Sequence, residues 1–455
     1  MMDNKTRKEL PDVFRTAMFS ELGMTGRTVL LAVLAGLYVA VAASLKYQAG
    51  GAMVCALVSG ACVLLLCVTA WRVMPCKKTV LLLMLALACG AAGLAHVGMM
   101  DVAPGRMSKV ITPMLEGMWP YDLLTAMAWQ EGNWSGGYLL VMALVSRIEN
   151  FSQMYALKLI DFACQCAVAM AVLRLALRGG AGKVASICGM LLCTLMPTAL
   201  LNGGCWMEFD ALFCALALWG LVGMLEGKFW GCLLVGMAGA FRLQALMLAP
   251  LMIPLYMKKR IALWHPLCGL AGYVIPQIPF LLDGQGWEAV FGRYAVQIQD
   301  FTYEGAGLTD HAAGVFGLMN IASYREFSGM GMYFAFACAL IVAALLITSR
   351  VEGERVWLLS ALLLCCGLPL VLPQQTARSL FMAGMLSLTL VDTREGVLTA
   401  LALEVVSLCC YLAAIFNLEV LPLSVLSLLA IGAATFTAVR LVDALKEGAR
   451  HEISG

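Results

Sequence analysis

Acidic and basic side chains are scarce in this sequence, and those at the ends of long apolar stretches are the first candidates for chemistry. Lys, Arg, Asp and Glu make up 13% of the 455 residues. Asp101 follows one such stretch and opens the polar segment 100–151. A carboxylate in this place can act as a general base that takes the proton from an attacking hydroxyl group. The alternative is a plain acid that ends a helix.

A second group of polar residues lies in the segment NGGCWMEFDALF, residues 202–213. Glu208 and Asp210 stand there beside Trp206, where a new apolar stretch begins. We interpret the three as candidates for substrate binding. The alternative is that they anchor a helix end at the membrane surface, where Trp is enriched.

Two arginines complete the candidate site. Arg242, with Gln244 close behind it, lies in the middle of an apolar stretch, where a charge is costly unless it faces the protein interior or a wet cavity. Arg242 therefore needs a negative partner, either an anionic phosphate group or Glu208. Arg378 stands at the beginning of another apolar stretch and can bind phosphate through two parallel N–H groups. A surface arginine that snorkels to the interface is the alternative for Arg378.

The other ionisable residues give weaker signals. His311 is the one histidine of four that falls in the polar segment 283–329, and we count it as a substrate-binding candidate. Lys158 and Asp161 are three residues apart on an expected helix, which predicts a local ion pair. No HExxH, paired CxxC, Walker or Rossmann pattern occurs, so we predict no tightly bound metal or other cofactor. A loosely held divalent cation at Asp101 is compatible with the residues.

Composition and hydropathy place the chain in a membrane. Hydrophobic residues make up 62% of the sequence, and the mean hydropathy is +0.88. Apolar stretches of about 20 residues, the length that crosses the hydrocarbon core, recur along the chain. They lack the alternation of a β-barrel, so we predict an all-α helical bundle. The net charge of +2 gives no reason to expect a nucleic-acid partner.

We expect about 12 full spans and one pair of half-length helices that meets near Arg242 within 229–257. The basic residues of 1–27 and of the tail place both termini in the cytoplasm of a cell, with the bundle in the cell membrane. The segments 100–151, 202–210, 283–329 and 373–378 then face outward. The run Tyr138–Val145 is too short to span and predicts a helix at the outer surface, beside amphipathic turns around Met107–Met118 and Tyr121–Trp129. The expected spans are 28–46, 50–71, 79–99, 152–173, 184–202, 209–225, 262–282, 330–349, 356–372, 378–392, 396–416 and 420–441.

Four stretches, in this order and spacing, are similar to a known family. They are Asp101 followed by NWSGGYLLVMALVSRI, then MYALKLIDF, then NGGCWMEFDALF with AFRLQALMLAP, and last GLTDHAAGVFGL with LPQQTARSLFMAGMLSL. Together they resemble the GT-C glycosyltransferases, in particular bacterial relatives of the mannosyltransferases of GPI-anchor assembly. The sequence departs from the family pattern at Glu208, where Gln is usual, and at Thr376 and Ala377, where His and Glu are common.

The resemblance implies an inverting transferase with a GT-C-like core at 79–392. Residues 1–78 would add a cytoplasmic N-terminus and two spans, and 393–455 would add C-terminal spans and a tail. A hexose such as mannose would pass from a polyprenyl-phosphate donor to a glycan, lipid or protein acceptor at the outer face. Asp101 would be the base, and Arg242 or Arg378 would hold the donor phosphate. The rival interpretations are a transporter or flippase of a lipid-linked or anionic solute, and a surface-polysaccharide polymerase.

Overall fold

A computed structural model describes residues 99, 102, 110–127, 134–149, 151–284, 286–288, 290–292, 308–318, 324–350 and 353–454. The expected spans before residue 99, the segment 1–78 and the candidate base Asp101 lie outside the described residues. The polar segment 100–151 is described in part, at residue 102 and from residue 110 onward with short gaps.

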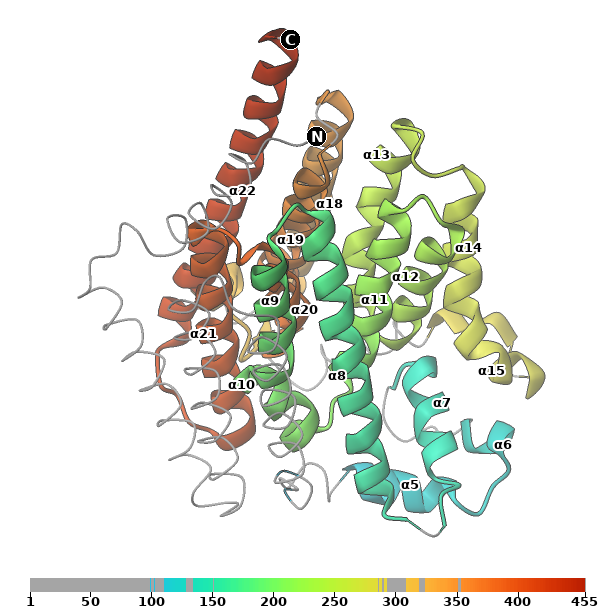
Figure 1. The fold of residues 1–455 in the computed structure, drawn as a ribbon. Helices are drawn as coiled ribbons and strands as arrows, with labels where there is room; N and C mark the ends of the chain where they lie inside the picture. The colour runs from blue at the N-terminus through green and yellow to red at the C-terminus, as the bar shows by residue number, and fades with distance from the viewer. Residues whose placement is uncertain are drawn as a thin grey trace, which may run out of the picture.

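Helices form most of the described chain, as expected for an all-α membrane protein (Figure 1). Within the described residues, seven helical segments are long and apolar enough to cross a membrane by length and composition. Two of them are composite: one joins α9 (Lys183–Leu195), α10 (Pro197–Ala199) and the π-helix η2 (Leu200–Trp206), and the other joins α14 (Trp264–Val274), η4 (Ile275–Gln277) and α15 (Ile278–Leu282). The remaining five belong to α8 (Gln153–Arg178), α18 (Tyr324–Thr348), α19 (Glu354–Val371), α21 (Arg394–Phe416) and α22 (Leu423–Ser454).

Two of the expected full spans form shorter apolar helices instead. The stretch 209–225 forms α11 (Asp210–Leu225), and 378–392 forms α20 (Phe381–Ser387) with the 3₁₀ turn η5 (Leu388–Leu390). Each is shorter than the shortest of the seven long segments, which has 18 residues. Most side chains of α11 and nearly all of those of α20 and η5 are buried, so both act as interior helices of the bundle.

The expected pair of half-length helices is present. Helix α12 (Phe229–Phe241) ends where Arg242 takes an extended conformation, with φ −153° and ψ 126°. The chain then continues as η3 (Leu243–Leu251) and α13 (Met252–Met257). Small residues let α12 lie close to α14, because Gly236 and Gly272 bring the two backbones into direct contact. The interruption of the helix between α12 and η3 therefore places Arg242 at the end of a helix.

Three short helices cover one end of the bundle (Figure 1). They are α5 (Thr112–Met118), α6 (Leu123–Met127) and α7 (Gly136–Val145). The first two fall within the segments for which amphipathic turns were expected, and α7 begins two residues before the expected run Tyr138–Val145. Their apolar side chains share a core with Met207, Phe209 and Phe280. This small core attaches the three helices to the start of α11, the end on which the candidate residues lie.

The opposite end of the bundle is tied by ion pairs. Glu226 accepts from Arg174 and Arg178, and Glu354 accepts from Arg178 and Arg260. These contacts join the end of α8 to the end of α11, the start of α19 and the segment after α13. The hydrogen bond from Arg174 and the positive charges beside it lower the pKa of Glu226.

Candidate functional site

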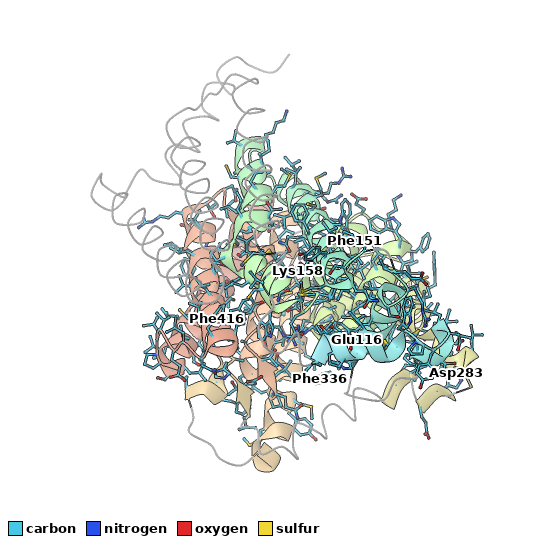
Figure 2. All side chains as sticks on the ribbon, turned by 90° about the horizontal axis from the view of Figure 1, so that it is seen from below. Glu116, Phe151, Lys158, Asp283, Phe336 and Phe416 are labelled. Atoms are coloured by element: carbon cyan, nitrogen blue, oxygen red, sulfur yellow. The ribbon has the colours of Figure 1, made fainter. Side chains whose placement is uncertain are left out.

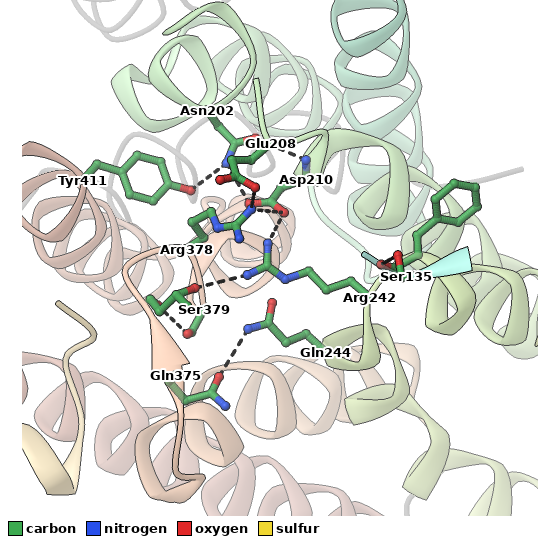
Figure 3. Close-up of polar contacts among 12 residues, drawn as sticks. Ser135, Asn202, Glu208, Asp210, Arg242, Gln244, Gln375, Arg378, Ser379 and Tyr411 are labelled. Atoms are coloured by element: carbon green, nitrogen blue, oxygen red, sulfur yellow. Dashed lines mark hydrogen bonds and ion pairs between the residues drawn. The ribbon is translucent and has the colours of Figure 1, made fainter. Parts of the chain in front are cut away.

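Two arginine–carboxylate pairs lie together where α11 begins (Figure 3). Arg242 donates to Asp210, and Arg378 donates to Glu208. The second pair also approaches the first, since Arg378 Nη1 is 3.7 Å from Asp210 Oδ1. Four residues singled out from the sequence thus form one cluster, which we call the arginine–carboxylate cluster.

The carboxylate that pairs with Arg242 is not the one expected. We expected Glu208, and the structure provides Asp210, while a phosphate partner stays a prediction. The reason is that α12 packs along α11, so the end of α12 meets the first residue of α11. Glu208 stands two residues earlier, outside the helix, and its side chain reaches Arg378 in the loop before α20.

The backbone that presents the two acids is strained. The π-helix η2 leads into Met207, with φ 55°, and Phe209 has φ 53°, so Glu208 lies between two residues in the left-handed conformation. His311 and Gln374, near the same site, have φ 51° and 59°. Such a conformation costs about 1–3 kcal/mol per residue outside glycine, and π-helices and strained residues gather at functional sites. Four of the six non-glycine residues of this kind in the described chain flank the cluster.

Asn202 and Tyr411 hold Asp210 in place. Asn202 Nδ2 donates to Asp210 Oδ2 at 2.7 Å and to the Tyr411 hydroxyl oxygen at 3.0 Å. The ring of Tyr411 packs edge-on against Trp206 with centroids 5.3 Å apart. Arg378 in turn lies over the Trp206 ring at 5.3 Å, a cation–π contact. Trp206 therefore joins the cluster as a platform for Arg378.

Sequence reasoning missed Asn202 and Tyr411. Tyr411 lies in α21, within an apolar run and beyond the predicted core that ends at residue 392. The sequence did contain a signal, a tyrosine in the middle of an expected span. A buried tyrosine hydroxyl group needs a hydrogen-bond partner, so this tyrosine predicts a polar neighbour. Asn202 carried the same signal at the end of an apolar stretch.

A short strand pair closes another side of the cluster. β1 (Thr309–Asp310) runs parallel to β2 (Gln375–Thr376), and the backbone of His311 bridges to Thr376. Arg242 Nη2 donates to Thr376 Oγ1 at 3.2 Å, and Gln244 Nε2 donates to Gln375 Oε1 at 3.2 Å. Gln244 is thus part of the site, whereas the His311 side chain is 41% exposed and lies 3.9 Å from Asp310.

Burial distinguishes the acids from the arginines. The exposed fraction is 1% for the side chain of Asp210 and 8% for Glu208, against 15% for Arg378 and 17% for Arg242. The arginines are therefore the part of the cluster nearest to solvent. Arg378 Nε and Gln244 Oε1 are buried without a hydrogen-bond partner in the described residues, and such orphan groups are places where water or a ligand can bind.

Lys158 reaches the chain on either side of position 101 in the sequence. Its Nζ donates to the carbonyl oxygens of Met99 at 2.5 Å and Val102 at 2.7 Å. Seen from the end that carries the site, Lys158 lies within the bundle, whereas Asp283 lies at its edge (Figure 2). The sequence predicted a local ion pair with Asp161, but among the described residues Lys158 donates to these two carbonyl groups and forms no ion pair with Asp161.

Metal-ligating side chains do not gather in the described part of the chain. No group of three or more His, Cys, Asp and Glu residues there could hold a metal ion. The role of Asp101 as a base and its loose binding of a divalent cation remain predictions.

Comparison with known proteins gives no family. No protein-family model matches the chain, and no curated protein matches it in sequence. Any function proposed for the chain therefore depends on the cluster and on the ordered motifs.

Proposed function

We propose that the protein is an integral-membrane glycosyltransferase that moves a sugar, a hexose such as mannose, from a polyprenyl-phosphate donor to an acceptor of the cell envelope. The observation that carries the proposal is the convergence of Arg242, Arg378, Glu208 and Asp210 on one end of an apolar bundle. A lipid-linked phosphate needs both an apolar environment for its chain and fixed positive charge for its headgroup, and this end of the bundle offers both.

The arginines would hold the donor phosphate. Breaking the bond between the anomeric carbon and the phosphate oxygen leaves negative charge on the phosphate, and fixed N–H donors stabilise that charge in the transition state. Glu208 and Asp210 would orient the two guanidinium groups, so that these donors need no reorganisation during the reaction. Trp206 and Gln244 would contact the substrate beside them, with His311 at the rim.

Asp101 is the proposed general base. It would take the proton of the acceptor hydroxyl group while the hydroxyl oxygen bonds to the anomeric carbon and polyprenyl phosphate leaves, with inversion at that carbon. Glu208 and Asp210 are less suited to this role, because each is engaged with an arginine.

The orientation in the membrane is part of the proposal. The site end would face outward and the end with the ion pairs of Glu226 and Glu354 would face the cytoplasm, as would both termini. Basic residues at the second end support this orientation by the positive-inside rule, among them Arg174, Arg178, Lys183, Lys258 and Lys259. A full set of about 12 spans belongs to this proposal.

One observation favours the transporter interpretation. Short helices that meet at a charged residue inside the bundle, as α12 and η3 do at Arg242, also form the ligand sites of secondary transporters. A transporter would carry the lipid-linked or anionic solute across without breaking the sugar–phosphate bond. The two functions therefore differ in their product.

A transfer assay tests the proposal. The purified full-length protein in lipid nanodiscs is incubated with a panel of radiolabelled polyprenyl-phosphate hexoses and an envelope extract as acceptor. We expect transfer by the wild type and by the control variant Asp122→Asn, an exposed acid, and none by Asp101→Asn. Transfer that survives in Asp101→Asn would move the base to another residue. If no donor supports transfer and the protein moves the lipid-linked sugar across the membrane of proteoliposomes, the protein is a transporter and the proposed enzyme activity is wrong.

A further inference from the structure

A third carboxyl group lies beside the arginine–carboxylate cluster, in a different environment. Asp161 belongs to α8 and is 3% exposed. Its Oδ1 atom is buried without a hydrogen-bond partner in the described residues. Glu208 and Asp210, by contrast, each accept from an arginine. Asp161 is thus a buried acid that the proposed reaction does not use.

Three elements enclose this carboxyl group. A Cβ atom at Gly203, in η2, would overlap Asp161 Oδ2 and would lie 2.6 Å from Asp161 Cγ. Asn202, the residue before Gly203, donates to Asp210, the first residue of α11. Asp161 therefore lies between α8, the π-helix and the start of α11, and no side chain larger than glycine fits at position 203 without a shift.

A second carboxylate, Asp210, lies nearby at the start of α11, because Asn202, which donates to Asp210, directly precedes the Gly203 that lies against Asp161. A carboxylate so close disfavours a second negative charge at Asp161. The other ionisable groups of the enclosing elements include Lys158 and Cys164 on α8, Cys205 on η2 and Cys214 on α11. The ammonium group of Lys158 donates to the backbone carbonyl groups of Met99 and Val102.

We propose that Asp161 is a proton-binding site and that its carboxyl group carries a proton in the resting protein. An ionised carboxylate with an unpartnered oxygen is costly in a low-dielectric interior, and such a group takes up a proton instead. A neutral Asp161 also adds no charge beside the cluster, in which the positive charges of two arginines and the negative charges of two carboxylates already cancel. An anion that binds at the arginines would favour the proton on Asp161 further. The proposal does not depend on which reaction the site performs.

Infrared spectroscopy tests the proposal. Spectra of the purified full-length protein in nanodiscs at neutral pH are compared between the wild type and Asp161→Asn. We expect the wild type to show a carbonyl stretching band of a protonated carboxylic acid that Asp161→Asn lacks. Glu404→Gln is the matched control, because Glu404 is a buried acid on α21 whose two oxygens accept from Thr198 at 3.1 and 2.7 Å. The band lost in Asp161→Asn should persist in Glu404→Gln.

A second measurement covers the case in which Asp161→Asn does not fold. The wild type is labelled with ¹³C at the aspartate side-chain carboxyl groups, which shifts the bands of aspartic acids and leaves those of glutamic acids in place. We expect one protonated aspartate band at neutral pH. The absence of such a band, or its persistence in folded Asp161→Asn, would overturn the proposal.

Discussion

Arg378 and Glu208 are 170 residues apart in the sequence, and the guanidinium group of Arg378 donates to the Glu208 carboxylate beside a second arginine–carboxylate pair. The contact joins the loop before α20 to the segment between η2 and α11. Both side chains are largely buried, so the two segments cannot separate without leaving a charge unpaired, which is strongly unfavourable. The ion pair therefore fixes the relative positions of the segments that carry the candidate site.

Arg242→Lys should abolish most of the activity. Arg242 uses separate nitrogen atoms for Asp210 and Thr376, and a lysine ammonium group lacks the planar fork that reaches both. Loss of one charged hydrogen bond corresponds to about 1.5–3 kcal/mol, so we expect the transfer rate to fall by about tenfold or more. The rate is measured with the labelled donor. Arg174→Lys, at the other end of the bundle, is the control and should keep the wild-type rate; equal rates for both variants would contradict the role of Arg242.

Tyr411→Phe should weaken the site without unfolding the bundle. The variant removes the hydroxyl oxygen that accepts from Asn202, the residue that holds Asp210. We expect a stability loss of about 1 kcal/mol and a clear fall in transfer rate. Tyr273→Phe removes the hydrogen bond that the Tyr273 hydroxyl group on α14 donates to the Val290 carbonyl oxygen at 3.1 Å, outside the cluster. A rate that falls equally in both variants would show that Tyr411 acts only through general stability.

The sequence predicts the helical class and most helix positions of the described chain, because long apolar stretches are easily recognised. Hydropathy alone does not separate the short interior helices α11 and α20 from full spans. It also indicates that Arg242 needs a negative partner. It does not identify that partner, because the choice between Glu208 and Asp210 depends on how α12 packs on α11 and on the left-handed turns at Met207 and Phe209. The role of Tyr411 cannot be predicted for a similar reason. In the sequence Tyr411 lies in an apolar run that could face lipid, and its role depends on how α21 packs against η2.

Gly236→Ala should destabilise the bundle. A Cβ atom at this position would lie 3.0 Å from Gly269 Cα and closer still to its carbonyl oxygen, so α12 and α14 would have to move apart. We expect a loss of about 1–3 kcal/mol, seen as a lower thermal unfolding midpoint in detergent. Gly432→Ala, in α22, has no atom within 4 Å of the added Cβ and should be neutral or stabilising by up to about 1 kcal/mol. A wild-type midpoint for Gly236→Ala would contradict the close packing.

The ion pairs of Glu226 predict a dependence of stability on pH. The hydrogen bond from Arg174 lowers the pKa of Glu226 in the folded protein below its value in the unfolded chain. The resulting stabilisation is therefore complete above the unfolded pKa, about 4.3, and is lost as the pH falls through the lower folded value. We expect the difference in unfolding midpoint between the wild type and Glu226→Gln to be present at pH 7 and to shrink in acid. A difference that is constant with pH would contradict the pairing.

Binding of the lipid phosphate tests the central claim, that the arginine–carboxylate cluster holds the donor headgroup. Equilibrium binding of a polyprenyl phosphate is measured with the purified full-length protein for the wild type, Arg378→Gln and the distant control Arg174→Gln. We predict saturable binding by the wild type and the control, and a dissociation constant at least about tenfold higher for Arg378→Gln, as the loss of a charged hydrogen bond implies. The same dissociation constant for a folded Arg378→Gln and the wild type would contradict the account.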